Sequence, residues 1–349
     1  METVNSASKA PVLTIRGLSK SLGKQKILTG ISLDVFPGEI FGFLGPNGSG
    51  KTTTIKLILG LLHIEEGEIS ICGHNVKTDF EAAMENVGGI IENPEMYKYL
   101  SGRENLVQYA RMYGKPDPAR IEELIRLVRL EARIDDKISK YSLGMRQRLG
   151  IAQALINRPK LIILDEPTNG LDPAGIKELR DILLNLAHSE NVAVFISSHQ
   201  LAELDLLCDR VGIIDRGTLL DTMTIDEVRS SGEGGKSAVT IEVEPGRALP
   251  ASLEGVLAFT DGGRLTGSIA HDDIPEAVSA LCGAGFRIYS VNSVKHSIED
   301  VFLSLTADYT PAGGGGTEGY APKTVPAKAD AADASSDVYF PGDTGNERK

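Results

Sequence analysis

The sequence predicts an α/β protein, in which helices cover a largely parallel sheet, followed by a small α+β domain and a disordered tail. Residues 12 to about 235 alternate short apolar runs with amphipathic segments, as strands and their covering helices do. A polar, glycine-rich stretch at 230–236 then precedes a region of different pattern. From residue 310 onward, large apolar residues are too sparse for burial to offset the entropy of ordering.

These composition changes predict the domain boundaries. Residues 1–11 form a flexible N-terminus, 12–235 the first domain, 237–308 the small domain and 309–349 the tail. Within the small domain we expect strands at 240–245 and 286–291 and a helix at 274–281. A last helix at 297–306 begins with Ser297 and Asp300, which can form a capping box.

Composition and charge exclude several classes of protein. No run approaches the roughly 20 apolar residues of a spanning helix, so we expect a chain that does not cross a membrane by itself. The net charge of -12 disfavours non-specific binding to nucleic acid. The three cysteines, Cys72, Cys208 and Cys282, have no paired spacing, which disfavours disulfides or a zinc site. We expect all three to be small buried residues in a reducing compartment.

The order strand, glycine loop and helix at residues 39–62 predicts a phosphate-binding loop. Its glycines allow successive amides to point inward, and the start of the helix adds positive partial charge. Lys51 can reach the outer phosphates of a nucleotide and Thr52 can bind Mg²⁺. The alternative is a glycine-rich turn that matches by accident. The candidate nucleotide-binding residues are Gly45, Pro46, Asn47, Gly48, Ser49, Gly50, Lys51, Thr52 and Thr53.

Two adjacent carboxylates follow the apolar run at 161–164. Asp165 ends the predicted strand, where it can hold Mg²⁺, and Glu166 points to the other side of the pleat, where it can polarise an attacking water. His199, which ends a second predicted strand at 191–199, can bind the terminal phosphate or orient Glu166. The alternatives are an ordinary acidic turn and a surface histidine. Together with the phosphate loop, these residues predict nucleotide hydrolysis.

The segment 141–155, YSLGMRQRLGIAQAL, precedes the acidic strand and is the motif that points to one protein family. The order of elements over residues 12 to about 220 resembles the ATP-binding-cassette (ABC) family, which has an LSGGQ signature here, then the acidic strand, a Leu-Asp turn and a histidine. The resemblance implies a P-loop NTPase cassette with a helical subdomain at about 92–155, which binds ATP and Mg²⁺. It also implies a head-to-tail dimer with a second copy or a homologous subunit. Asp172 would lie at the dimer seam, and the signature residues that contact the partner's nucleotide would be Ser142, Leu143, Gly144 and Met145.

The sequence departs from the family pattern at several positions. Leu143 and Met145 replace a glycine and a glutamine of the signature, and Leu22 replaces the aromatic residue that stacks on adenine. Glu92 replaces a glutamine and is a candidate metal ligand. Glu92 and the altered signature resemble the bacitracin-resistance and lantibiotic-immunity ATPases. This resemblance implies a cytoplasmic subunit, peripheral on the inner face of the membrane, that energises export of a drug or antimicrobial peptide through a separate permease.

Two other functions compete with this interpretation. A soluble cassette ATPase that acts on ribosomes or DNA is the alternative function, although the chain has one phosphate loop and the distance from Thr52 to Ser142 is too short for a long coiled coil. A regulatory binder without hydrolysis is disfavoured because Lys51, Asp165, Glu166 and His199 are all present. The apolar segment 94–100 forms either a groove for the permease or ordinary core, and the sequence leaves both open.

Overall fold

The computed structural model describes residues 10–200, 204–230, 236–244, 246–260, 263–294 and 301. These residues fall into two units, one made of 10–200 with 207–222 and the other of 204–206 with those from 223 onward. The predicted flexible N-terminus, apart from its last two residues, and the predicted tail lie outside the described residues.

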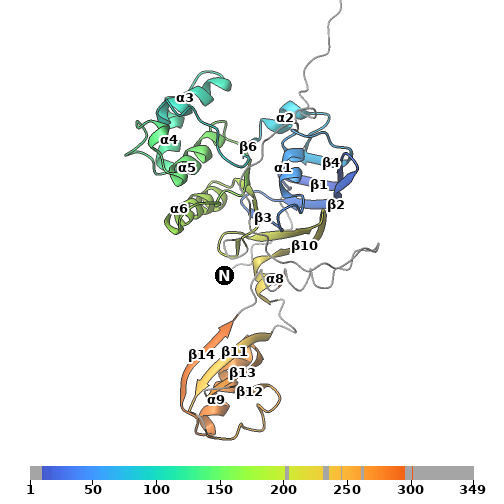
Figure 1. Ribbon diagram of the computed structural model, residues 1–349, viewed down its shortest axis with the longest axis vertical. Helices are drawn as coiled ribbons and strands as arrows, with labels where there is room; N and C mark the ends of the chain where they lie inside the picture. The colour runs from blue at the N-terminus through green and yellow to red at the C-terminus, as the bar shows by residue number, and fades with distance from the viewer. Residues whose placement is uncertain are drawn as a thin grey trace, which may run out of the picture. The chain divides into compact units, whose positions relative to one another are not determined.

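A six-stranded sheet organises the first unit, with strand order β10-β9-β3-β8-β7-β6 (Figure 1). The strands β9, β3, β8, β7 and β6 pair in parallel. Every residue of β3, β7 and β8 is buried, as in parallel sheets covered on both faces. The strands are β3 (Ile40–Leu44), β6 (Val87–Ile90), β7 (Leu161–Asp165), β8 (Ala193–Ser198), β9 (Arg210–Asp215) and β10 (Thr218–Thr224).

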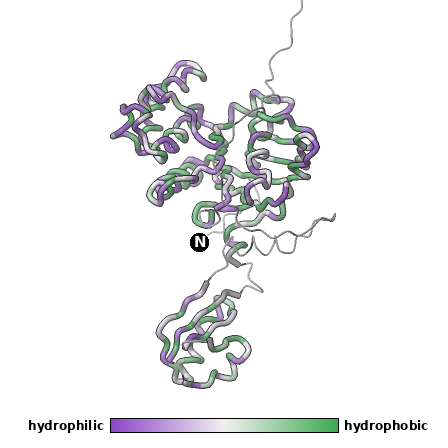
Figure 2. Tube along the Cα trace, in the orientation of Figure 1, coloured by the Kyte–Doolittle hydropathy of each residue, from purple (hydrophilic) through white to green (hydrophobic). Residues whose placement is uncertain are grey.

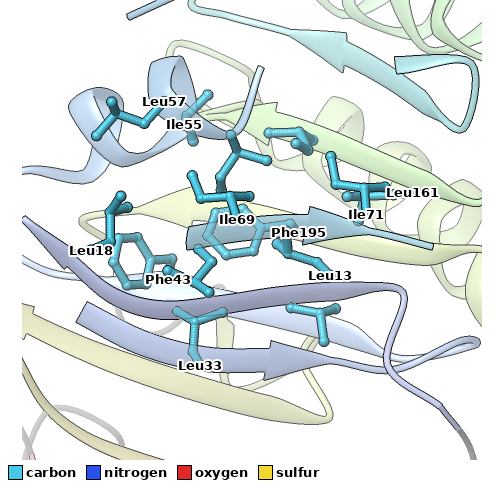
Figure 3. Packing of buried hydrophobic residues seen from close by; sticks show 14 of the residues in the cluster. Leu13, Leu18, Leu33, Phe43, Ile55, Leu57, Ile69, Ile71, Leu161 and Phe195 are labelled. Atoms are coloured by element: carbon cyan, nitrogen blue, oxygen red, sulfur yellow. The ribbon is translucent and has the colours of Figure 1, made fainter. Parts of the chain in front are cut away.

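A second sheet of four strands, ordered β2-β1-β4-β5, is antiparallel. The sequence predicted only a largely parallel sheet here, but the chain reverses at Gly23 and its two long strands pair as a hairpin. The main core joins residues of both sheets and of α1, including Leu13, Phe43 and Phe195 (Figure 3). The elements are β1 (Leu13–Leu22), β2 (Gln25–Val35), β4 (Glu66–Ile71), β5 (His74–Asn75), α1 (Lys51–Ile58) and α2 (Phe80–Met84).

Three helices between β6 and β7 group together (Figure 1). Each of them begins at a residue whose side chain caps the helix. At the start of α5, for example, Ser142 Oγ accepts a hydrogen bond of 3.2 Å from the Met145 amide. Asp172 caps the next helix in the same way, through the Gly175 amide at 3.0 Å. The helices are α3 (Gly102–Met112), α4 (Pro118–Leu127), α5 (Leu143–Ala154) and α6 (Pro173–Leu184), with short turns at η2 (Ile138–Lys140) and η3 (Asn185–Ser189).

The second unit contains an antiparallel sheet of order β12-β13-β11-β14 and the helix α9 (Ile274–Gly283), which confirms a small α+β fold. Its core includes Ile241, Leu265 and Leu281. Of the predicted last helix, only Val301 is described. The other elements are α8 (Ile225–Ser230), β11 (Lys236–Val243), β12 (Leu257–Thr260), β13 (Arg264–Ala270), η5 (His271–Asp273) and β14 (Ile288–Val294).

Hydrophobic and hydrophilic residues alternate along the chain (Figure 2). In the described part of the chain, no helix is long and apolar enough to span a membrane. The prediction that all three cysteines are buried is wrong. Cys208 is buried, Cys72 is half-buried and Cys282 is exposed. Cys282 lies in the last turn of α9, which turns Ala277 and Leu281 toward the core and leaves Cys282 outside.

Candidate functional site

The loop between β3 and α1 presents backbone amides at the start of a helix. Gly48 and Gly50 have φ values of 83° and 109°, which side chains disfavour, and no side chain caps α1 at Gly50. The first amides of α1 have no intrahelical partner and carry positive partial charge. A Cβ on Gly50 would lie 2.5 Å from Leu28 Cδ2, so packing also requires glycine here. This loop can bind phosphate.

Lys51 is buried in the loop. Its ammonium group donates to the carbonyls of Gly45 at 2.7 Å and Pro46 at 3.2 Å, and lies 3.7 Å from Glu166 Oε1. Burial lowers the pKa of Lys51, while the negative charges of Glu166 and Asp165 oppose that change. The ammonium group therefore stands between the phosphate loop and the carboxylates.

Asp165 joins three elements at the carboxyl end of the sheet. Its Oδ2 accepts a hydrogen bond of 3.0 Å from Thr52 Oγ1 at the start of α1, and its Oδ1 accepts one of 2.5 Å from Ser197 Oγ on β8. The side chain is 3% exposed. Buried carboxylates need such partners, and these two fix the direction in which Asp165 points.

Glu166 leaves the strand with φ +48°, a left-handed value that is uncommon for residues other than glycine. Its amide donates to Ser197 Oγ at 3.0 Å, and its Oε2 lies 3.1 Å from His199 Nδ1. The pair of Glu166 and His199 is thus in hydrogen-bonding range. Left-handed backbone at such positions is common at functional sites.

Thr52, Asp165 and Glu166 line one cavity of about 550 Å³. Glu92, another residue with a left-handed φ of +57°, lines the same cavity as the two carboxylates, although it is far from them in the sequence. Leu143 and Gln147 contribute from α5 of the same chain. The lining residues are Thr52, Glu92, Asn93, Leu143, Gln147, Asp165, Glu166, Asn169 and Gly170.

Comparison with known proteins agrees with this geometry. Residues 28–169 match the model of the ABC transporter family. The chain is 45% identical to the uncharacterized ABC transporter ATP-binding protein YdbJ of Bacillus subtilis, over 87% of this chain and 98% of that protein. The chain belongs to the ABC transporter ATP-binding family. It is therefore an ABC ATPase, which binds and hydrolyses ATP.

Two further matches bear on this ABC ATPase. It is 44% identical to the bacitracin transport ATP-binding protein BcrA of Bacillus licheniformis, over 62% of this chain and 71% of that protein. A solved structure titled as the ATP binding subunit of an ABC transporter is 33% identical and superposes with a TM-score of 0.56, covering 62% of this chain and 92% of that one. The P-loop cassette fold is thereby confirmed.

The remaining sequence-predicted residues of the ABC ATPase lie at different places. Ser142 is exposed at the start of α5, and Leu143, Gly144 and Met145 follow it half-buried. Leu143 lines the cavity of its own chain, a position that the sequence did not predict. Leu22 ends β1, paired with Gln25, and is 43% exposed.

The candidate metal ligands of the site are all oxygen atoms, which suit Mg²⁺ better than a transition metal. Among the described residues, no three His, Cys, Asp or Glu side chains are arranged to hold a metal ion by themselves. Mg²⁺ needs no such cage, because it is usually held by one or two carboxylates together with phosphate and water oxygens. Thr52, Asp165 and Glu92 offer such hard oxygen donors in one cavity.

Sequence reasoning assigned no role to four polar residues of the site. Asn93, Gln147 and Asn169 line the cavity, and Ser197 bridges Asp165 to the Glu166 amide. Ser197 lies near the end of β8, two residues before His199. The other three carried no signal of their own.

Proposed function

We propose that this ABC ATPase energises export of a drug or antimicrobial peptide through a separate transmembrane permease. The observation that carries the proposal is the single cavity that holds the hydrolytic carboxylates together with Glu92. Glu92 precedes the segment 94–100, in which Tyr97 is 50% and Tyr99 is 69% exposed. These exposed rings support a partner surface at this segment rather than core packing alone. The likeness to a bacitracin transport protein supports the class of substrate.

In this proposal the predicted site residues have distinct roles in ATP binding and hydrolysis. The loop amides of residues 45–53 and Lys51 hold the ATP phosphates, and Leu22 covers the base. Thr52, Asp165 and Glu92 hold Mg²⁺, which when bound neutralises phosphate charge. Glu166 accepts a proton from the attacking water, and His199, 3.1 Å from Glu166 Oε2, orients that carboxylate.

We further propose that two subunits, identical or homologous, associate head to tail. Ser142 caps α5 from an exposed position, so the first amides of this helix can face a nucleotide on another subunit. Leu143, Gly144 and Met145 would complete that contact, and Asp172, which caps α6, would lie at the seam. Leu143 would then serve both its own cavity and the partner's nucleotide.

The domain boundaries at 12–235 and 237–308 remain part of the proposal, as does a peripheral location on the inner face of the membrane. Truncation after residue 236 tests the boundary. The shortened chain should bind ATP as the full chain does, because the phosphate loop and the carboxylates precede it. A shortened chain that folds but binds no ATP would refute the boundary.

The permease is tested by purifying the full chain together with the products of its neighbouring genes. We expect a protein with several membrane spans to co-purify, and its vesicles to take up a labelled cyclic peptide antibiotic only when ATP is present outside. The Glu166→Gln chain in the same vesicles is the control. Co-purification of ribosomes or DNA in place of a membrane protein would favour the alternative, an ABC ATPase that acts on those assemblies.

A further inference from the structure

A second cavity, of about 880 Å³, lies at the amino ends of the parallel strands. Pro37 precedes β3, Lys160 precedes β7 and Val192 precedes β8, and all three line it. The candidate nucleotide cavity lies at the opposite, carboxyl end of the same strands, where Asp165 ends β7. The length of β7, about 16 Å at 3.3 Å per residue, therefore separates the two cavities.

Cationic side chains dominate the charge of this second cavity. Arg120, Arg158 and Lys160 line it against one acid, Glu190. The whole chain has a net charge of -12, so a positively charged hollow is unlike the average of its surface. Low-dielectric walls concentrate such a field and favour anions.

Arg120 is built into the wall. It is 7% exposed and donates to Glu123 Oε1 and to the Leu155 carbonyl, each at 2.8 Å. Its Nε is buried without a hydrogen-bond partner among the described residues. Glu123 also faces Arg158, at 3.5 Å, so one carboxylate serves two guanidinium groups. The positive charge of this pair is only partly compensated.

Lys160 is the most available of the three cations. It is exposed and forms no ion pair with any residue in the described ranges. Cys72 also lines the cavity and is half-buried. Burial raises the pKa of its thiol, and the positive charge of Lys160 partly opposes that change. An anion beside Lys160 would therefore lie near the thiol of Cys72.

The rest of the lining is largely apolar. Pro11, Val12, Pro37, Leu155, Pro159 and Val192 contribute to the cavity. Its volume is within the range of small-molecule sites, which combine an apolar lining with a few charged groups. We propose that this cavity is a second ligand site, separate from the nucleotide cavity, for a small organic anion with an apolar body, whose charged group is held by Lys160, Arg158 and Arg120.

Protection of Cys72 from N-ethylmaleimide tests the site in the full chain. The probe is 1-anilinonaphthalene-8-sulfonate, an aromatic sulfonate, with ATP and Mg²⁺ kept saturating so that the nucleotide cavity is occupied. Modification of each cysteine is followed by peptide mass spectrometry. We expect the probe to slow modification of Cys72 and not that of exposed Cys282, which serves as an internal control. Uncharged N-phenyl-1-naphthylamine should protect Cys72 less.

Charge variants make the test specific. Lys160→Gln should weaken binding of the probe and so raise the probe concentration for half-protection by about two- to fivefold, as expected when one exposed ion pair is lost. Lys115→Gln, at an exposed loop position that does not line the cavity, should leave this concentration unchanged. Each variant is compared with itself without probe, because Lys160 also affects the reactivity of Cys72.

Three results would overturn the proposal. One is equal protection in the parent and in Lys160→Gln, and another is equal protection by the neutral analogue. The third is protection only after residues 1–9 are deleted, which would mean that the chain's own N-terminus fills the cavity. All of these readouts are independent of transport, so the second site can fail while the proposed export function stands.

Discussion

Thr52 Oγ1 lies 3.0 Å from Asp165 Oδ2, although 113 residues separate the two in the chain. This contact joins the helix that follows the phosphate loop to the strand that ends at Asp165, next to Glu166, the two carboxylates that we propose act in hydrolysis. Both groups are hard oxygen donors, so the pair can pass from a mutual hydrogen bond to shared binding of Mg²⁺.

Glu166→Gln should lower ATP turnover by about 100-fold or more and leave ATP binding intact, because the amide cannot accept the proton of the attacking water. Steady-state hydrolysis and an ATP titration measure the two effects. Glu131→Gln, which removes an exposed carboxylate outside the cavity, is the control. Parental turnover in Glu166→Gln would mean that another group is the base.

Lys51→Ala should weaken ATP binding by about 10- to 100-fold, as the loss of a charged hydrogen bond to phosphate implies. Isothermal titration of both proteins measures this. Lys56→Ala, one turn further along α1, removes a charge from the same helix without touching the phosphate loop. Equal affinity in the parent and in Lys51→Ala would contradict the assignment.

Glu92→Gln should relax the dependence of ATP binding on Mg²⁺. Without the cation, the carboxylate of Glu92 adds negative charge to a cavity that already holds Asp165 and Glu166 and so disfavours nucleotide. The measurement is ATP affinity across a magnesium titration for both forms. Superimposable curves would show that Glu92 does not act at the metal.

Ser197→Ala should lower turnover by about tenfold and stability by about 1–3 kcal/mol, because the hydroxyl both donates to Asp165 and accepts from the Glu166 amide. Ser197→Thr retains the hydroxyl and should recover much of the turnover. Ser198→Ala is the matched control on the same strand, since its hydroxyl contacts Gln200 and not the carboxylates. If Ser197→Thr does not restore turnover and Ser197→Ala has the same turnover as Ser198→Ala, Ser197 is not a positioning residue.

Tyr141 should make stability depend on alkaline pH. Burial, with a smaller effect from the charge of Asp136, raises the pKa of Tyr141 to about 12 from 10.0. A raised pKa means stabilisation that is complete below about pH 10 and is lost as the pH rises through about 12. The loss is up to about 3 kcal/mol. Urea unfolding of the parent and of Tyr141→Phe between pH 9 and 12 measures it, and parallel pH curves for the two proteins would contradict the assignment.

The sequence by itself determined the local chemistry. The glycines of the phosphate loop, the helix that follows it and the carboxylates after an apolar strand are set by backbone conformation and by strand alternation, which neighbouring residues decide. The order of these segments was enough to indicate the family. The α/β and small α+β folds could be predicted for the same reason.

Only the tertiary structure decided which distant residues meet. The parallel pairing of β7 with β8 brings Ser197 to Asp165, and the path of α5 brings Leu143 and Gln147 into the cavity of their own chain. The cationic cavity likewise needs α4, the turn before β7 and the turn before β8 to converge. No local pattern contains this information, because strand register and helix placement follow from packing of the whole core, in which residues far apart in sequence bury each other.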